Sequence, residues 1–486
     1  MLAIYWFYQY DFSILSTINI QIMSKQVAKV SARKANNEIL TPAQMSRVDE
    51  ACGIEIEELI DRAGRAVAEE VVRRFGARKT VVLCGPGNNG RDGHVAARYL
   101  KAWGWPVTVS NELGEAELIV DALFGAGLNK DFPAQLASEI NAAGVPIVAV
   151  DVPSGLDGLT GKPRGACVKA DLTITFFRRK PAHVLLPGKE LCGETVALDI
   201  GISAANLDEI DIQLWENSKP QLPTSAPEGH KFNRGHAVVV SGNKLKTGAS
   251  RLSAQAALKI GAGLVTLVGH ADALAVHANH LTAIMLEEIS TPETLSDVLS
   301  DQRKNAICIG PAAGVDEATI QKVKVALSSA AAVVLDADAL NSFSENPHVL
   351  FDLIKTRKNA SVVLTPHEGE FARLFGTLTN IADSKIERVR AAAQISGAIV
   401  ILKGADTVIA HPDGRAIVNT NAPPSLATAG SGDVLAGLVT GLLAQGMLVF
   451  EAAAAAVWVH SETAAAFGNR AFTAEDLVKQ IGQQAV

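Results

Sequence analysis

The sequence ATAGSGD at Ala427–Asp433 leads directly into the apolar stretch VLAGLVTGLLAQG. Small residues ahead of a helix let consecutive backbone amides approach one anion, and the start of the helix adds a partial positive charge. Asp433 falls in the first turn of this predicted helix, where it can accept a proton from a hydroxyl group or simply cap the helix. Taken alone, the motif supports both interpretations equally.

The apolar run that begins there, Val434–Phe450, contains three glycines and is flanked by Asp433 and Glu451. It is shorter than the roughly 20 residues that cross a bilayer. We therefore predict a buried helix of a large α/β core, and we expect no membrane partner.

Two further motifs follow predicted strands in the same half of the chain. KGADT at Lys403–Thr407 follows the apolar run Ile399–Leu402, and TPHEGE at Thr365–Glu370 follows Ser361–Leu364. The carboxyl ends of strands line the ligand crevice of an open parallel sheet. These companions favour a nucleotide site that includes Asp433, and we interpret His367 as a ligand contact there.

The first half of the chain has its own constellation of glycine-rich turns. GPGNNGRDG at Gly85–Gly93 lies between a strand-like run and a helical stretch, and the later turns DALFGAG and DVPSGLD begin with Asp121 and Asp151. An unpaired carboxylate near a sheet costs desolvation energy, so packing explains these acids poorly. Asn89, Asp121 and Ser154 all supply oxygen, so a hard cation could bridge them.

Apolar runs alternate with amphipathic helical stretches from about residue 40 to the end, which is typical of βα units and a mostly parallel sheet. The predicted strands are Thr80–Cys84, Leu118–Ala122, Ile147–Asp151, Leu172–Phe176, Thr195–Ile200, His236–Val240, Leu264–Val268, Ala306–Ile309, Ala332–Leu335, Ser361–Leu364, Ile399–Leu402 and Arg415–Val418. Thr41, Pro42 and Gln44 predict a helix start with a capping box. We place a linker in the proline-rich segment between Gly201 and Arg234.

Composition narrows the class of protein. The 486 residues suggest two or three domains, and 48% hydrophobic against 20% charged residues excludes a disordered chain. A formal net charge of -7 disfavours a nucleic-acid partner. Five scattered cysteines without a CxxC pair fit a reducing cytosol, so we expect a cytoplasmic protein. The aromatic-rich start of the chain is interpreted as an extension ahead of Met23, outside either core.

The first half resembles the NAD(P)H-hydrate epimerase domain through LTPAQM, GPGNNG, VDALFGAG, DVPSGLDG, TFFRRKPAHVLLPG and LDIGI. The resemblance implies a Rossmann-like three-layer domain over residues 38–218 that interconverts the R and S hydrates of NADH and NADPH with a potassium ion. It implies substrate contacts from Asn88, Asn89, Gly90, Arg91, Asp92, Gly125, Ala126, Gly127, Leu128, Asn129, Lys130, Asp131 and Asp151, and potassium ligands Asn89, Asp121 and Ser154. We assign Asp151 as the acid/base group, since a carboxylate is the titratable group in its turn.

The second half resembles the ADP-dependent NAD(P)H-hydrate dehydratases of the ribokinase-like superfamily, through HKFNRGH, KTGASRLSAQAALKIGAGLVT, LDADALN, TPHEGEFARL, LKGADTVI and AGSGDVLAGL. The resemblance implies an α/β/α domain over residues 219–486 that uses Mg2+ and ADP or ATP, with Asp433 as the catalytic base. The substrate would contact Ala249, Gly314, His367 and Asp433, and the adenine nucleotide Lys403, Gly404, Ala405, Asp406, Thr407 and Gly432.

Three departures from the family patterns carry expectations of their own. Arg91 stands where the family has glycine, which predicts backbone strain if that position needs a positive φ, or else a contact with a dinucleotide phosphate. The segment between Asn89 and Asp121 is short, so we expect a helix and a strand to be trimmed. Gly310–Gly314 reads GPAAG where the family prefers GPGLG.

We therefore predict a bifunctional enzyme that repairs hydrated nicotinamide nucleotides. Its partners would be the small-molecule hydrates NADHX and NADPHX and an adenine nucleotide, and we expect a homo-oligomer. Two alternatives stay open at this point. The first half could be a non-catalytic nucleotide-binding module, or the second half could be a ribokinase-type kinase that releases a phosphorylated small molecule.

Overall fold

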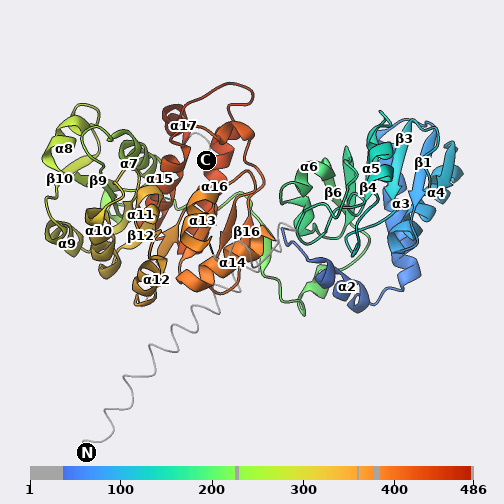
Figure 1. Cartoon of the computed structure of the whole chain (residues 1–486), viewed down its shortest axis with the longest axis horizontal. Helices are drawn as coiled ribbons and strands as arrows, with labels where there is room; N and C mark the ends of the chain where they lie inside the picture. Colours follow the sequence, from blue (N-terminus) through green and yellow to red (C-terminus); the bar gives the residue numbers. More distant parts are fainter. Residues whose placement is uncertain (1–36, 225–228, 358–360, 377–383, 483–486) are drawn as a thin grey trace, which may run out of the picture. The chain divides into compact units, whose positions relative to one another are not determined.

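The computed structural model describes residues 37–224, 229–357, 361–376 and 384–482, so the extension predicted for residues 1–37 lies almost wholly outside the described residues (Figure 1). The chain divides into two compact units. The first takes in the described part of Met1–Gly158 with Pro163–His183 and Leu191–Trp215, and the second Leu159–Lys162, Val184–Glu190 and Glu216–Val486.

The first unit is built on a six-stranded parallel sheet in the order β2-β1-β3-β4-β5-β6. Its strands are β1 (Thr80–Cys84), β2 (Val107–Ser110), β3 (Leu118–Ala122), β4 (Ile147–Val150), β5 (Leu172–Phe176) and β6 (Glu194–Leu198). β3, β4 and β5 are buried along their whole length, as continuous apolar runs in a covered parallel sheet should be.

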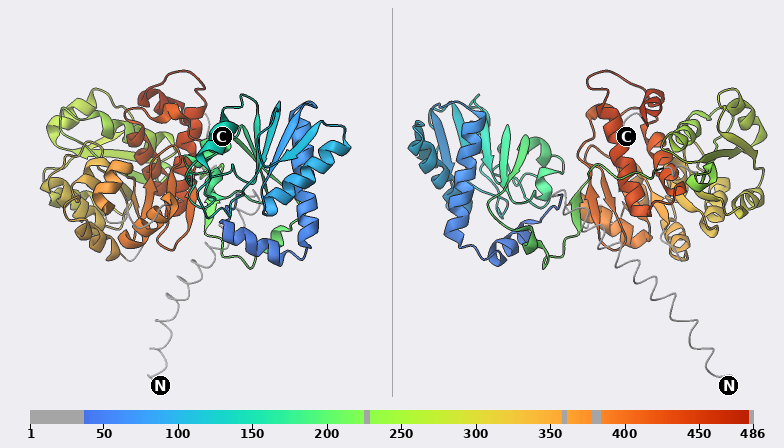
Figure 2. Two further views of the ribbon diagram at one scale, coloured as in Figure 1. Left: turned by 45° about the vertical axis from the view of Figure 1, so that its right-hand side comes forward. Right: turned by 180° about the vertical axis from the view of Figure 1, so that it is seen from behind.

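The helices of the first unit lie around this sheet (Figure 2). They are α2 (Pro42–Ala51), α3 (Ile56–Arg74), α4 (Asn88–Ala102), α5 (Ala134–Asn141) and the short α6 (Gly188–Cys192). α3 packs on α4, which lies on β1, β2 and β3. The capping box predicted for α2 is confirmed, because the Thr41 side chain accepts from the Gln44 amide and the Gln44 side chain accepts from the Thr41 amide.

Between Asn89 and Asp121 the structure has the rest of α4 and the strand β2, and the expectation that a helix and a strand are trimmed there relative to the family stays a prediction. The connection from β2 to β3 must cross β1, because β1 lies between them in the sheet. Residues 111–117 make this crossing with no helix. Parallel strands are usually joined by a dozen or more residues with a helix, so this crossover is unusually short.

The second unit is built on a ten-stranded sheet in the order β10-β9-β8-β11-β12-β13-β14-β15-β16-β7. Neighbours from β10 to β14 pair in parallel, whereas β14, β15 and β16 are antiparallel. The strands are β7 (Leu214–Glu216), β8 (His236–Val240), β9 (Leu264–Gly269), β10 (Met285–Glu288), β11 (Lys304–Ile309), β12 (Ala332–Leu335), β13 (Val362–Leu364), β14 (Ile399–Leu402), β15 (Val408–Ala410) and β16 (Ala416–Val418).

The helices of this unit alternate with its strands, which confirms the α/β class expected for both halves. They are α7 (Gly248–Lys259), α8 (Ala271–Ala278), α9 (Pro292–Ser300), α10 (Glu317–Ser328), α11 (Ala337–Asn341), α12 (Pro347–Lys355), α13 (Glu368–Phe375), α14 (Lys385–Ser396), α15 (Ser431–Ala444), α16 (Val449–Ala465) and α17 (Ala474–Gln480).

The apolar run after Asp433 forms a buried helix, as the sequence predicts, but this helix ends at Ala444, and Val449 and Phe450 already belong to α16. α15 packs against α7 and lies on β8, β11 and β12. Its glycines permit this approach, because a Cβ at Gly437 would lie 2.2 Å from the Ser253 carbonyl oxygen and one at Gly441 2.6 Å from that of Ala257. Within the described ranges, no helix has both the length and the apolar character that a membrane span requires.

Candidate active sites

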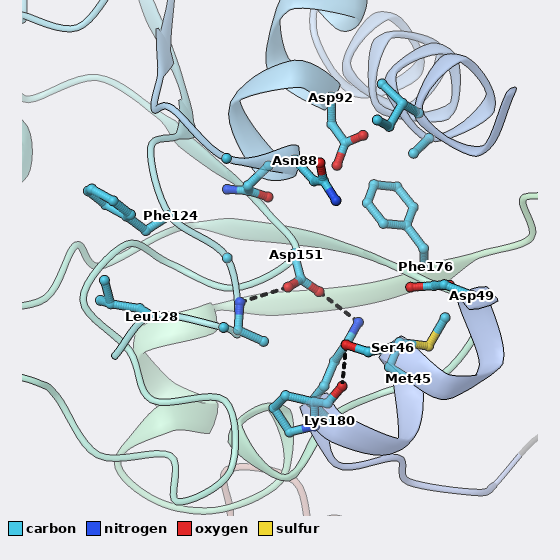
Figure 3. Close-up of a pocket in the computed structure, with 18 of the residues that line it drawn as sticks. Met45, Ser46, Asp49, Asn88, Asp92, Phe124, Leu128, Asp151, Phe176 and Lys180 are labelled. Carbon is cyan, nitrogen blue, oxygen red and sulfur yellow. Dashed lines mark hydrogen bonds and ion pairs between the residues drawn. The ribbon is translucent and has the colours of Figure 1, made fainter. Parts of the chain in front are cut away.

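The first unit contains a pocket of about 450 Å³ at the carboxyl ends of its strands (Figure 3). The turns after β1, β3 and β4 form one side of it, and apolar residues of α2 and α3, including Met45, Leu59 and Ile60, form the other. The predicted substrate residues that line it are Asn88, Asn89, Asp92, Gly125, Ala126, Gly127, Leu128, Asn129, Lys130 and Asp151. Gly90, Arg91 and Asp131 are not among the lining residues.

Asp151 lies at the centre of this pocket on a strained backbone. Its φ is 67°, a left-handed conformation that is costly for a residue other than glycine and that is often found at functional sites. Its Oδ2 accepts from the Ala126 amide at 2.8 Å, and its Oδ1 lies 2.6 Å from Lys180 Nζ. Burial alone would raise the pKa of Asp151, but the charge and hydrogen bond of Lys180 lower it to about 2.

His183 fixes the backbone around this carboxylate. Its Nδ1 accepts from the Lys180 amide at 2.9 Å, so the ring proton lies on Nε2, which donates to the Asp151 carbonyl at 2.8 Å. Burial, with the nearby Lys180 charge, lowers the pKa of His183 to about 4, so the imidazole is neutral at pH 7.

Two further carboxyl groups line the same pocket. Burial, together with the charge of Asp151, raises the pKa of Asp92 to about 8. Burial likewise raises the pKa of Asp49, on α2, to about 6. The sequence assigned no role to Asp49 or Lys180; the motif TFFRRKPAH was the signal available for Lys180.

The three predicted potassium ligands are held differently. Asp121 and Ser154 are fully buried and bonded to each other, with Ser154 Oγ donating to Asp121 Oδ1 at 2.6 Å and the Ser154 amide to Oδ2 at 2.8 Å. Among the residues that the structure describes, neither the amide oxygen nor the amide nitrogen of the buried Asn89 side chain finds a hydrogen-bond partner. A Cβ at Gly125 would lie 3.3 Å from Asn89 Oδ1 and 2.9 Å from Asp151 Oδ2, so these oxygens face the same turn.

Position 91 does not need a positive φ, so the backbone strain considered above does not arise, and a phosphate contact by Arg91 stays a prediction. It lies in the first turn of α4, in an ordinary helical conformation. Its guanidinium forms an ion pair with Glu57 on α3 and donates to Asn88 Oδ1 at 3.4 Å. Position 90, in contrast, has no room for a side chain, because a Cβ there would lie 1.8 Å from the Gly85 carbonyl oxygen.

The second constellation surrounds the start of α15. Gly430 takes a φ of 84°, and Ser431, Gly432 and Asp433 form the first turn of the helix. Burial, followed by the charge of Asp336, raises the pKa of Asp433 to about 7. Lys403 opposes that shift without cancelling it.

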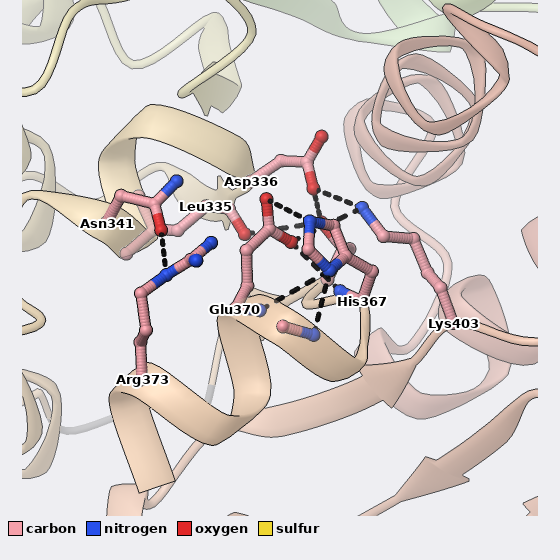
Figure 4. A network of polar contacts seen from close by, with 9 residues as sticks. Leu335, Asp336, Asn341, His367, Glu370, Arg373 and Lys403 are labelled. Atoms are coloured by element: carbon pink, nitrogen blue, oxygen red, sulfur yellow. Dashed lines mark hydrogen bonds and ion pairs between the residues drawn. The ribbon is translucent and has the colours of Figure 1, made fainter. Parts of the chain in front are cut away.

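Lys403 belongs to a polar network with two buried acids (Figure 4). Its Nζ lies 2.8 Å from Asp336 Oδ1 and 3.8 Å from Glu370 Oε2. A Cβ at Gly432 would lie 3.3 Å from the same Nζ. The Lys403 ammonium group therefore borders the glycine turn in which an anion would bind.

His367 has a structural role as well as its predicted one. Its Nδ1 caps α13 by accepting from the Gly369 amide at 2.9 Å, while Glu370 Oε2 accepts from the His367 amide at 2.9 Å. The ring remains about half exposed. Its Nε2 lies 3.4 Å from Glu370 Oε1, so the ligand contact predicted for His367 would share this nitrogen with Glu370.

The remaining predicted residues lie in turns or at helix starts of the second unit. Gly314 donates its amide to Asp338 Oδ2 at 2.9 Å and has a φ of 93°, and Ala249 lies in the first turn of α7. In KGADT, Thr407 Oγ1 donates to the Gly404 carbonyl at 2.7 Å, and Asp406 pairs with Lys385. Gly404 and Ala405 are exposed.

In comparisons with known proteins, the two halves of the chain match two different family models. A family model described as NAD(P)H-hydrate dehydratase matches residues 237–484, and one described as YjeF-related protein N-terminus matches 56–114 and 106–182. A bifunctional NAD(P)H-hydrate repair enzyme of Moorella thermoacetica is 35% identical over 90% of this chain and 95% of its own length. The corresponding protein of Escherichia coli is 34% identical over 87% of this chain and 88% of its own.

Among solved structures, an ADP/ATP-dependent NAD(P)H-hydrate dehydratase of Bacillus subtilis, co-crystallised with ATP and Mg2+, is similar to part of the chain. It is 26% identical with a TM-score of 0.47, over 54% of this chain and 92% of its own. On the sequence relationships over nearly its whole length, the chain belongs to the family of bifunctional NAD(P)H-hydrate repair enzymes.

Proposed function

We propose that this chain restores hydrated NADH and NADPH by two reactions at two separate sites. Residues 38–218 interconvert the R and S hydrates at C6, and residues 219–486 dehydrate the S form at the expense of ADP or ATP. The last segment of the first compact unit ends at Trp215, and the second unit continues from Glu216, which supports this boundary.

The observation that carries the proposal is the environment of Asp433. A carboxyl group with a pKa of about 7, in the first turn of a helix that starts with glycines, is suited to take a proton from a hydroxyl group at neutral pH. The amides of that turn and the Lys403 ammonium supply positive charge beside it. Such an arrangement favours phosphoryl transfer.

The proposed dehydration has two balanced steps. Asp433 accepts the C6 hydroxyl proton while that oxygen attacks the terminal phosphoryl group, so that ADP leaves as AMP. The C6–O bond then breaks with loss of phosphate, a proton leaves C5, and the C5–C6 double bond returns. Phosphorylation is needed because hydroxide is a poor leaving group.

Mg2+, when bound, would supply positive charge to the phosphates of the nucleotide, and only one or two protein carboxylates would be needed to hold it. Asp336 and Glu370 are candidate carboxylates, since both act electrostatically on Asp433. Within the described residues, no group of three or more His, Cys, Asp or Glu side chains could hold a metal by itself.

In the epimerase half, Asp151 is the proposed acid/base group and Asn89, Asp121 and Ser154 the proposed potassium ligands. The Asn89 side-chain oxygen, which no described residue bonds, and the oxygens of the buried Asp121–Ser154 pair are donors suited to an oxygen-seeking monovalent cation. Bound potassium would supply positive charge for a phosphate or hydroxyl oxygen of the substrate.

The substrate and nucleotide contacts named for the two halves, action in the cytoplasm and a homo-oligomeric state are further parts of the proposal. The free state of all five cysteines supports the compartment. The contacts and the oligomer follow from the family resemblance.

Product analysis tests the function. Full-length protein is incubated with pure S hydrate, ADP and Mg2+, and we expect reduced cofactor, AMP and phosphate in equal amounts. Accumulation of a stable phosphorylated acceptor without reduced cofactor would instead identify a kinase. With pure R hydrate, a rate no higher than spontaneous epimerisation plus dehydration would remove the epimerase assignment.

A further inference from the structure

Lys180 is a buried cation inside the first pocket to which the motifs assign no role. The residue is 3% exposed and lines the pocket beside Asp151 (Figure 3). Its Nζ lies 2.6 Å from Asp151 Oδ1 and donates to Thr175 Oγ1 at 2.7 Å. An ammonium group in so dry a position is stable only with such partners.

These contacts leave the Asp151 carboxylate a single orientation. Oδ1 is held by Lys180 and by the Thr175 hydroxyl, which donates at 3.1 Å, and Oδ2 is held by the Ala126 amide. The neutral His183 ring ties the backbone of Lys180 to that of Asp151. The cation and the carboxylate are therefore fixed to each other through both side chains and main chains.

We propose that Lys180 is the positioning residue of the epimerase site, whose ammonium group fixes the orientation and the negative charge of the Asp151 carboxylate for proton exchange with the substrate. This inference rests on the proposed role of Asp151. The inference adds a residue that acts through Asp151. Lys180 keeps the carboxylate ionised before the substrate binds, so that the carboxylate is ready to accept a proton.

The other ionisable groups around Asp151 make Lys180 necessary. Asp92 on α4 and Asp49 on α2 face the same pocket and interact with Asp151 unfavourably. His183 is neutral, so Lys180 is the cation that dominates the lowering of the Asp151 pKa. Its removal would leave a partly buried carboxylate among other acids, and the pKa of Asp151 would rise.

The test follows epimerisation alone, with full-length protein, pure R hydrate and no adenine nucleotide, by chromatographic separation of the R and S forms across pH. In Lys180→Met we expect the rate at neutral pH to fall by about a hundredfold or more, the usual size of an acid/base contribution. We also expect the acidic limb of the pH profile to move to higher pH. Lys180→Arg, which keeps the charge, should restore the position of that limb.

Two further variants serve as a control and as a milder test. Lys169→Met removes an exposed lysine of the same unit and should change neither rate nor profile. Thr175→Val removes a hydroxyl that donates to Asp151 and accepts from Lys180, and it should shift the acidic limb in the same direction by less. If Lys180→Met does not fold, the pH profile of Thr175→Val tests the proposed role of Lys180 instead.

The outcomes separate the inference from the function on which it rests. If the wild-type protein does not exceed the spontaneous rate, the proposed epimerase function fails. If the wild type is active and Asp151→Asn is not, but Lys180→Met or Thr175→Val keeps the wild-type pH profile, Lys180 is merely structural and the inference is overturned.

Discussion

Asp151 and Asp433 are both partly buried aspartates with a lysine close by, yet their pKa values are shifted in opposite directions. In the first unit, Lys180 bonds directly to Asp151 and holds its pKa at about 2. In the second unit, Lys403 bonds to Asp336 instead, and the pKa of Asp433 rises to about 7. The comparison teaches that the partner of the lysine, and not its presence, decides whether the pKa of the aspartate in the free protein lies far below neutral pH or close to it.

The largest expected effect comes from removing the titrating group of the second site. Asp433→Asn should lower the dehydration rate by about 10²–10⁴-fold, because the hydroxyl proton loses its acceptor. Epimerisation of R hydrate should be unchanged. Coupled measurement of both rates checks this, with Asp297→Asn on the exposed face of α9 as the matched control. A variant that keeps most of its dehydration rate would remove Asp433 from the mechanism.

The next experiment makes the second site resemble the first. Asp336→Asn removes the charge that most strongly raises the pKa of Asp433 after burial, and it frees Lys403 from its closest partner. The pKa of Asp433 should fall, the acidic limb of dehydration should move to lower pH, and the rate at neutral pH should drop by roughly tenfold as the base weakens. An acidic limb that stays in place would show that Asp336 does not control Asp433.

The wild-type pH profiles compare the two aspartates without any mutation. Dehydration should rise as pH increases through about 7, because Asp433 must be ionised to accept a proton. Asp151 is ionised throughout that range, so it should contribute no such limb to epimerisation. Initial rates of each reaction, in the same buffers, give the answer; a shared limb near pH 7 would contradict the assignment.

Stability should respond to pH with opposite signs at the two sites. The folded pKa of Asp433 is raised, so its contribution is full below the unfolded value of 3.8 and is lost as pH rises through about 7. The folded pKa of Asp151 is lowered, so its contribution is present above 3.8 and is lost as pH falls towards 2. Asp433→Asn should therefore raise the thermal midpoint at pH 8, and Asp151→Asn should lower it. Equal effects of the two variants would contradict the comparison.

The smallest expected effect concerns backbone strain, which differs between the crevices. In the first, Asp151 itself is strained, whereas in the second Ala312 and Ala337 have positive φ values of 57° and 44°, and Ala312 stands where the family prefers glycine. Ala312→Gly should relieve strain of about 1 kcal/mol, partly offset by the greater freedom of glycine in the unfolded chain. Denaturant unfolding should show a gain of at most about 1 kcal/mol, and a loss would mean that the alanine methyl group contributes packing.

The sequence predicted the class of the fold and most of its strands, because buried parallel strands read as continuous apolar runs. It missed β2, β7, β10 and β15, which are short or partly exposed and lack that signal. It also missed the contributions of Asp49 and Lys180 to the first pocket, since these residues come from segments distant in sequence from the glycine motifs. The sequence could not show that Arg91 has a helical backbone, because the motif does not tell at which residue the helix begins.

The close packing at the start of α4 has a consequence for mutational tolerance. A side chain at Gly90 would overlap the Gly85 carbonyl, and one at Gly85 would overlap the carbonyl of Leu123 at 1.8 Å. Position 91 faces outward instead, towards Glu57. In a saturation library, Gly85 and Gly90 should accept no replacement, whereas position 91 should accept many, so the glycine usual there can be exchanged for arginine without disturbing the turn.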